Sequence, residues 1–347
     1  MASRGLRNSN MTWRDSRPAV ILVRMARPAP AVRDPDLPMR QVPSWCPVPA
    51  ARRTTRLSVG LVAAAAIAGT LAPGAATEAG PALLVTAGLL GLPHGAVDHL
   101  ALGWVRGRTG AARPGVLFAY AAAAMVAAVA ALAAPLPALL LLLALSVAHF
   151  AEGEAAFDRL RGGVGLMLPA AALGTAVVAL PLVLRPAAAR PLLLALDPAL
   201  PAVLAGARLP LLVGTALLVT AGLAVALRGG QRAAAAELAV VAVAAALGPP
   251  LVVFAVWFAG WHAPRHLVRL AAFEPSGDGR ERVRRLARGA ALPTAFAAAG
   301  LAGLALLLGG LPAAVLIVLL ALTVPHAAVV AQLDRLVTTT TLDSSAA

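Results

Sequence analysis

The stretch Gly91-Leu-Pro-His-Gly-Ala-Val-Asp-His-Leu100 places two histidines and an aspartate inside an apolar run that extends from Pro81 to Trp104. A run of this length is long enough to cross the hydrocarbon core of a bilayer as a helix. A charged side chain at the centre of such a helix costs about 2.5 to 3.5 kcal/mol on insertion scales. Ionisable groups in this position therefore indicate a functional site.

The composition of the whole chain is that of a helical membrane protein. Of its 347 residues, 60% are hydrophobic and 13% are charged, whereas soluble domains average about 45 to 50% apolar residues. The apolar runs are rich in Ala, Leu and Val and are about 20 residues long, without the short alternating segments of a transmembrane barrel. The sequence predicts an all-α fold, a polytopic transmembrane helical bundle.

Ten apolar segments from Leu57 onward predict the transmembrane helices. They cover about residues 57–74, 81–104, 115–134, 137–157, 164–184, 209–227, 233–247, 250–270, 290–308 and 311–333. The number of spans is eight to ten, because the breaks at Gly248-Pro-Pro250 and Gly309-Gly-Leu-Pro312 can be tight turns or kinks. The stretch from Pro191 to Leu200 is too short and too rich in proline to span.

The net charge of +14 comes from arginine, which supplies all 29 basic residues against 15 acidic ones. Loops after even-numbered segments, together with the C-terminal tail, carry fourteen arginines, and loops after odd-numbered segments carry three. This asymmetry predicts an even number of spans with both termini in the cytoplasm, as expected for a multi-pass protein of the inner (plasma) membrane. The same rule, with contacts to anionic membrane lipid, explains the basic charge without nucleic acid as a partner.

The chain divides into a transmembrane body and two tails. Residues 1–56 are rich in Arg and Pro and show no sustained periodicity, which predicts a disordered cytoplasmic tail. Residues 57–335 form the transmembrane domain that would carry any catalytic site, and residues 336–347 form a short polar C-terminal tail. A secretory signal is not expected, because the apolar patch from Ala19 to Val23 is too short.

All six histidines lie on the second, fourth, eighth and tenth predicted spans, each of which runs from outside to inside. They are His94, His99, His149, His262, His266 and His326. Counted from the outer ends of their spans, they lie about 18 to 27 Å along the helices at 1.5 Å per residue. Four helices therefore present imidazole in one layer, in the inner half of a bilayer about 30 Å thick, which is how a helical bundle builds a metal centre.

The eighth span carries a pair of candidate ligands. His262 and His266 are four residues apart, so they share a helix face and can bind one ion from successive turns. Pro264 between them is expected to kink or tighten the helix near Gly260. Arg265 is expected to extend toward the headgroups at the inner surface.

The second and fourth spans offer ligands with orienting partners. His94 shares a helix face with Asp98 but diverges by about 140° from His99 at 100° per residue. We therefore expect His94 to bind the ion, with Asp98 or His99 as the group that orients a ligating imidazole. Glu152 can serve His149 in the same way. Imidazole ligands without a thiolate suit Fe, Zn or Cu, and ligand type alone does not choose among them.

Four short motifs in these spans carry a resemblance to a known protein family. They are Gly91-Leu-Pro-His-Gly-x-x-Asp-His99, His149-Phe-x-Glu152, Trp261-His-x-x-Arg-His266 and Pro325-His326. These motifs follow one another in the same order as in the bacterial and archaeal Brp/Blh family of β-carotene 15,15′-dioxygenases, which the chain resembles over roughly residues 80 to 335. The resemblance implies an integral membrane enzyme with non-haem iron, Fe²⁺, held by histidines. Such an enzyme cleaves the central double bond of β-carotene, or of a related carotenoid, with O₂ to give two molecules of retinal.

The resemblance also assigns roles to the histidines. It implies that the iron ligands are His94, His149, His262 and His266. The remaining candidates act beside the ion as catalytic or orienting residues, and they are Asp98, His99, Glu152 and His326. A functional link to a retinal-binding rhodopsin is a further expectation.

Three other classes of function compete with this one. A transporter or a proton or metal conduit would place ionisable residues at several depths, yet the first, third, fifth and ninth spans carry none. A di-iron hydroxylase or desaturase, or a bis-histidine haem protein, would need more core ligands or a haem spectrum. A non-catalytic relative would bind carotenoid or retinal without cleaving it.

Overall fold

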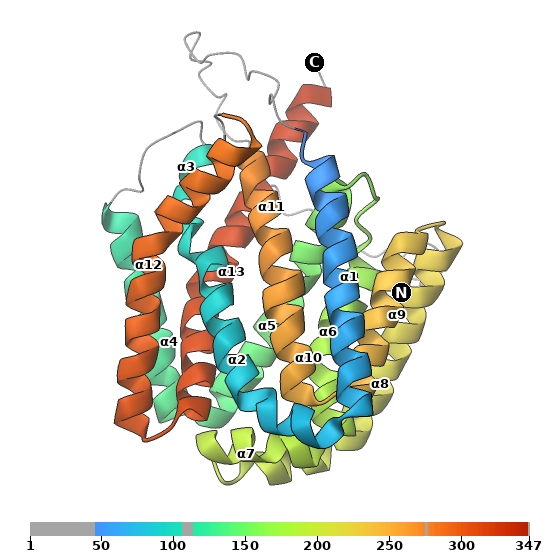
Figure 1. The fold of residues 1–347 in the computed structure, drawn as a ribbon. Helices are drawn as coiled ribbons and strands as arrows, with labels where there is room; N and C mark the ends of the chain where they lie inside the picture. Colours follow the sequence, from blue (N-terminus) through green and yellow to red (C-terminus); the bar gives the residue numbers. More distant parts are fainter. Residues whose placement is uncertain (1–45, 106–113, 275–276, 346–347) are drawn as a thin grey trace, which may run out of the picture. The chain divides into compact units, whose positions relative to one another are not determined.

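The computed structural model describes residues 46–105, 114–274 and 277–345, and every regular element in these ranges is a helix (Figure 1). The elements are α1 (Val48–Leu71), α2 (Pro73–Ala96), α3 (Asp98–Val105), α4 (Pro114–Ala133), α5 (Pro135–Leu160), α6 (Met167–Leu184), α7 (Pro186–Leu196), α8 (Leu200–Arg228), α9 (Arg232–Leu247), α10 (Pro250–Trp257), the π-helical turn η1 (Phe258–His262), α11 (Ala263–Phe273), α12 (Gly279–Leu308) and α13 (Leu311–Ser345). The predicted all-α class is confirmed.

Each of the ten predicted segments is helical. Within the described ranges, eight helices are long and apolar enough to cross a membrane: α1, α2 with the start of α3, α4, α5, α6, α8, α12 and α13. The other two predicted segments are α9, with 16 residues, and the series α10–η1–α11, which a π-helical turn interrupts. Eight is thus the lower end of the expected range, and the side on which the termini lie stays a prediction.

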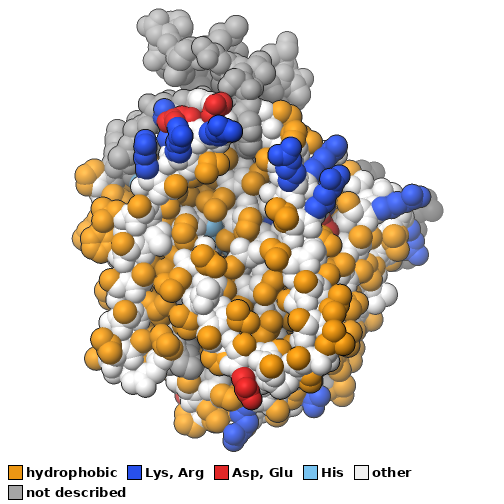
Figure 2. Space-filling view, in the orientation of Figure 1, with side chains coloured by type: hydrophobic (Ala, Val, Ile, Leu, Met, Phe, Trp, Pro, Cys, Tyr) orange, Lys and Arg blue, Asp and Glu red, His pale blue; other side chains and the backbone are white. Residues whose placement is uncertain are grey.

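The surface fits a lipid environment. Figure 2 shows hydrophobic side chains over most of one face, with arginines gathered toward the end where α1 begins. Large apolar side chains stand outward from the long helices, including Phe118 at 77% exposure and Leu306 at 85%. A bundle that faces lipid can expose such groups without loss, because lipid tails are as apolar as leucine.

Prolines and glycines mark several helix ends. Proline stands in the first turn of α1, α2, α5, α7, α8 and α10, where its missing N–H would lack a helical partner in any case. Gly309 ends α12 with a φ of 67°, a left-handed conformation that glycine adopts without strain.

Several helices begin earlier or end later than expected. Helices α2, α8 and α12 begin at Pro73, Leu200 and Gly279, before the predicted residues 81, 209 and 290. Helix α1 begins at Val48 instead of Leu57, and α13 extends to Ser345, past residue 335. Pro49 favours the early start, because its fixed φ suits the first turn of a helix. The rest of the predicted N-terminal tail, residues 1–45, lies outside the described residues.

Two hydrophobic clusters contain residues that lie close to the histidines along the chain. The first contains Phe150, Trp257 and Trp261 and joins α1, α5, α6, α9, α10 and η1. The second contains Val97 and Leu270 and joins α3, α11, α12 and α13. Packed apolar side chains on these helices leave the imidazoles little freedom to move.

Candidate metal centre

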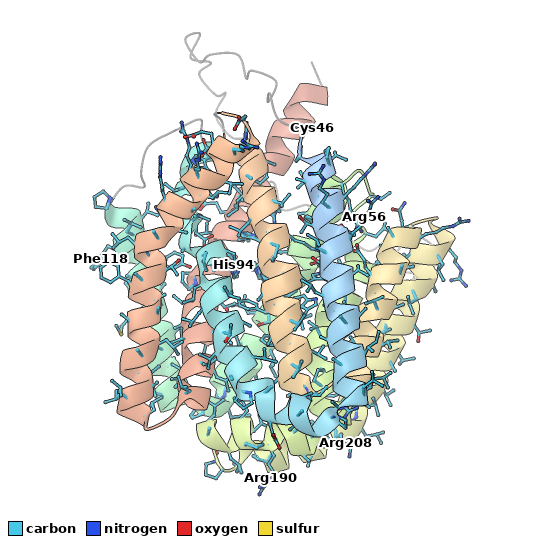
Figure 3. The ribbon with its side chains drawn as sticks, in the orientation of Figure 1. Cys46, Arg56, His94, Phe118, Arg190 and Arg208 are labelled. Carbon is cyan, nitrogen blue, oxygen red and sulfur yellow. The ribbon has the colours of Figure 1, made fainter. Side chains whose placement is uncertain are left out.

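Five of the six histidines converge in the interior of the bundle. His94 comes from α2, His149 from α5, His262 from η1, His266 from α11 and His326 from α13. All five are buried, and eight of the ten pairs of rings have centroids 4.6 to 6.4 Å apart. Figure 3 labels His94, which lies inside the bundle among the helices. The single layer expected from the sequence is therefore present for these five rings.

The π-helical turn shapes the helix that carries two of them. Pro264 has no N–H to donate to the carbonyl of Gly260, the partner that an α-helix would give it. The buried hydroxyl of Ser58 on α1 donates to that carbonyl instead, at 2.8 Å. The turn is widened, which contradicts one of the two expected alternatives, a tightened helix; the kink stays a prediction. Such π-turns are frequent at functional sites. His262 and His266 keep a common face, with ring planes only 19° apart.

Two glycines allow helix α2 to approach its neighbours closely. A Cβ on Gly91 would lie 2.1 Å from Cε1 of Phe258, and a Cβ on Gly95 would lie 3.3 Å from Nδ1 of His326. No side chain fits at the first position, and the second leaves little room. The glycines on both sides of His94 therefore bring that histidine against η1 and α13.

Hydrogen bonds fix the orientation of two rings. The Nδ1–H of His94 donates to the carbonyl of Gly91 in a short contact, and the Nδ1–H of His326 donates to Oδ2 of Asp98 at 2.7 Å. Because carbonyl and carboxylate oxygens only accept, the proton sits on Nδ1 and Nε2 carries a lone pair in each ring. A carboxylate behind a histidine is the usual support for a metal ligand.

The nitrogen spacing suits a shared cation. Nε2 of His326 and Nε2 of His149 are 3.2 Å apart. Two nitrogen ligands at about 2.1 Å from one ion, separated by about 90 to 109°, stand about 3.0 to 3.4 Å apart. The measured distance falls within that interval.

The ligand atoms form two overlapping groups in the described part of the chain, each with its atoms within 4.8 Å of one another. The groups are His94, His262 and His326, and Asp98, His266 and His326. Nε2 of His262 and Nε2 of His266 are buried with no hydrogen-bond partner among the described residues. Buried polar atoms rarely stay without a partner, so these residues fit a bound metal ion.

His149 belongs to neither group, although its Nε2 lies 3.2 Å from Nε2 of His326, and the remaining predicted site residues lie differently. His99 is half-buried, its Nδ1 bonded to the carbonyl of Ala96 at 2.9 Å, and it belongs to neither group. Of the two expected partners, Asp98 is the one that reaches the cluster, where it contacts His326. Glu152 is half-buried and also lies outside both groups.

Tyr120 on α4 was not expected at the site. It is the single tyrosine of the chain, and its hydroxyl donates to Oδ2 of Asp98 at 3.3 Å. The same carboxylate oxygen thus receives bonds from Tyr120 and from His326. The sequence signal that could have indicated this role of Tyr120 is a single tyrosine within an alanine-rich span.

Arg265 does not extend to the headgroups, which corrects the expectation. It is 2% exposed, and its guanidinium donates to Glu154 at 2.6 Å and to Glu237 at 3.2 Å. The guanidinium also lies 3.8 Å from the ring of Trp261, whose indole N–H donates to Glu154 at 2.9 Å. The helix that carries His262 and His266 is therefore tied to α5 and α9.

Two further arginines extend these ties. Arg161 pairs with Glu237 in a short contact and with Asp158 at 2.8 Å. Arg269 on α11 pairs with Asp334 on α13, also in a short contact. Ion pairs thus connect the helix that carries His262 and His266 with α9 and with α5 and α13, which carry His149 and His326.

An apolar cavity of about 290 Å³ adjoins the histidines. His94, His149, His262 and His326 form part of its wall, and Leu, Val, Ala, Pro and Phe side chains from most of the helices form the rest. The other ionisable or hydroxyl-bearing side chains in the wall are Asp98, His99, Tyr120, Ser146 and Thr323. Such a cavity suits an apolar ligand that is oriented by a few polar groups at one place.

The fold and the site together define a class: a helical membrane protein with a buried histidine centre beside an apolar cavity. The family model described as "Beta-carotene 15,15'-dioxygenase" matches residues 85–334, a range that includes all five clustered histidines. The chain belongs to this carotenoid dioxygenase family, which confirms the resemblance noted in its motifs. Neither a curated protein nor a solved structure matches it.

Proposed function

We propose that this protein cleaves β-carotene with O₂ at the central 15,15′ double bond, giving two molecules of all-trans-retinal. The observation that carries the proposal is a cluster of five buried imidazoles, four of which line an apolar cavity in a lipid-facing bundle. In the reaction one carbon–carbon double bond breaks and two carbonyl groups form. Both oxygen atoms come from O₂, so no external reductant is needed.

We propose an iron(II) centre held by His94, His149, His262 and His266. His326 belongs with this set, because its Nε2 faces His149 while Asp98 holds its Nδ1. An all-nitrogen donor set suits Fe, Zn or Cu, and oxygen chemistry favours iron among the three. Bound ferrous iron would supply the activation of O₂ that the polyene alone does not provide.

The chain itself contributes binding, orientation and the exclusion of water. The apolar wall takes up a substrate that is dissolved in the bilayer, so the polyene never has to enter water. Packed helices hold the imidazoles in fixed positions. A substrate bound beside them has already lost translational and rotational freedom, which lowers the activation barrier of the reaction. Tyr120 and Asp98 keep the ring of His326 in place. A rhodopsin that receives the retinal remains a prediction.

Expression in a β-carotene-producing bacterial host tests the proposal. We expect the orange colour to fade and retinal to accumulate, and we expect His262→Ala and His266→Ala each to abolish the product and to lose iron on purification. Thr77→Ala, an exposed change on α2, serves as the control and should leave both readouts unchanged. Undiminished retinal from both histidine variants would remove the assigned centre, and a stoichiometric metal other than iron would remove iron from it.

A further inference from the structure

The cavity has an apolar end away from the histidines, and its wall there includes the short helix α7. The side chains at this end are Leu139, Leu182, Ala189, Leu192, Leu193 and Leu251, and none has a polar atom. Ala189 and Leu193 of α7 are 3% and 4% exposed and pack against Leu200 of α8. Helix α8 therefore backs α7, which makes this end of the cavity a packed floor.

Helix α7 is fixed at this position by its neighbours. Figure 1 shows it lying across the end of the bundle opposite to the start of α1, and Figure 3 shows Arg190 and Arg208 at that end. The guanidinium of Arg185, at the junction of α6 and α7, donates to the carbonyl of Leu247 in a short contact. Arg208 on α8 donates to the carbonyl of Val183 on α6 at 2.7 Å.

The floor lies at a similar depth along separate helices. Ten residues separate Leu139 from His149 on α5, and eleven separate Leu251 from His262. At 1.5 Å per residue both intervals correspond to about 15 to 17 Å. Two helices thus place the floor at one distance from the imidazoles.

We infer that α7 acts as a depth stop that selects which double bond of the polyene lies at the histidine centre. The inference rests on the proposed function. A conjugated polyene is a stiff rod, so the part that reaches the floor fixes the bond that remains beside the imidazoles. The other half of the rod follows the cavity toward α4 and α12, where Leu117 and Ala297 line it. For a symmetric carotene, a floor that accepts one half selects the central bond.

Substitutions at the floor test the depth stop. Leu193→Ala deepens it, and we expect unequal apocarotenal products, one longer and one shorter than retinal, beside a reduced share of retinal. Leu193→Trp raises the floor and should lower retinal formation from full-length β-carotene by about tenfold or more, since pockets discriminate single groups by about 10- to 200-fold. Ala189→Leu raises the floor by a smaller amount and gives a second measurement if the Leu193 variants fail to accumulate.

The matched controls are Leu194→Ala and Leu194→Trp on the same helix. Leu194 is 37% exposed and does not line the cavity, so these variants should retain the product ratio of the unaltered protein. Chromatography of the aldehydes gives the ratio directly. Retinal as the sole product of all floor variants at undiminished rate would overturn the depth stop while leaving the proposed function in place. Absence of retinal from the unaltered protein would overturn both.

Discussion

Arg265→Met should destabilise the protein strongly, because Arg265 is the shared cation of two buried carboxylates. Its removal leaves Glu154 with only the indole N–H of Trp261 and leaves Glu237 with Arg161. Taking one partner from a buried ion pair costs about 3 to 5 kcal/mol, because the remaining charge stays buried without compensation. The loss is a large fraction of the 5 to 15 kcal/mol by which domains are typically stable.

Glu154→Gln should cost less than Arg265→Met. The amide oxygen can still accept from Trp261, and the charge that would need compensation is gone. In the double variant both members of the pair are removed together, so its destabilisation should be smaller than the sum of the two single effects. We expect a coupling of about 0.5 to 3 kcal/mol, the size found for residues in one hydrogen-bond or salt-bridge network.

Unfolding in mixed detergent micelles, titrated with a denaturing detergent, measures these differences. Arg288→Met is the matched control, since Arg288 is exposed on α12 and its replacement should change stability by no more than about 0.5 kcal/mol. Iron retention is a second readout, because Arg265 lies between His262 and His266 on the chain. Additive single effects, or an Arg265→Met variant as stable as the control, would refute the reasoning.

Three further predictions concern other parts of the molecule. Gly91→Ala should lower the free energy of unfolding by about 1 to 3 kcal/mol and lower iron retention, because the added Cβ would lie 2.1 Å from the ring of Phe258. Gly88→Ala is the control, since its Cβ would meet no atom within 4 Å, and unfolding in urea or detergent compares the two variants. The carboxyl of Asp278 accepts hydrogen bonds from backbone N–H groups at the start of α12, and these bonds lower its pKa. The stabilisation from this carboxylate is therefore present at neutral pH and is lost as the pH falls through the lowered pKa. Asp278→Asn should remove this part of the acid sensitivity of unfolding. Chelation of the proposed metal ion should lower the free energy of unfolding by about 2.7 kcal/mol if the ion had been present at 100 times its dissociation constant. An unchanged unfolding curve would contradict a structural contribution of the ion.

The helices and the histidine layer follow from the sequence for one reason. Lipid excludes ionisable groups from spanning helices, so histidines in otherwise apolar segments are conspicuous, and their depth can be counted along each helix. The common face of His262 and His266 follows from a spacing of four residues, and the π-turn that ends at His262 leaves it intact.

The orienting residues could not be chosen in the same way. Helix α2 ends at Ala96 and α3 begins at Asp98, so the phase that relates His94 to Asp98 in one continuous helix does not apply across Val97. Asp98 meets His326 and Tyr120 because α13 and α4 pack beside that break. Contacts between helices depend on which helices become neighbours, and spacing within a single segment carries no information about that.

Arg265 shows the same limit for charges. An arginine near the predicted inner end of a span has two solutions, extension to the headgroups or burial against acids on other helices. The choice depends on Glu154 and Glu237, which lie 111 and 28 residues away in the sequence. Nothing in the local pattern around Arg265 indicates that these carboxylates reach it.

The distribution of polar groups separates a closed centre from a conduit. A path for protons or metal ions needs polar side chains or water along its whole length. In the cavity wall toward α7, Ser146 and Thr323 lie within one helical turn of His149 and His326, and the wall beyond them is formed by leucine, valine, alanine, proline, phenylalanine and glycine. The buried ion-pair residues Arg265, Arg161 and Glu237 do not line this cavity, and their charges are paired, since the two arginines together engage Glu154, Glu237 and Asp158. An ion that reached the imidazoles would therefore meet a hydrocarbon wall beyond them, whereas a hydrocarbon substrate would meet a wall that matches it.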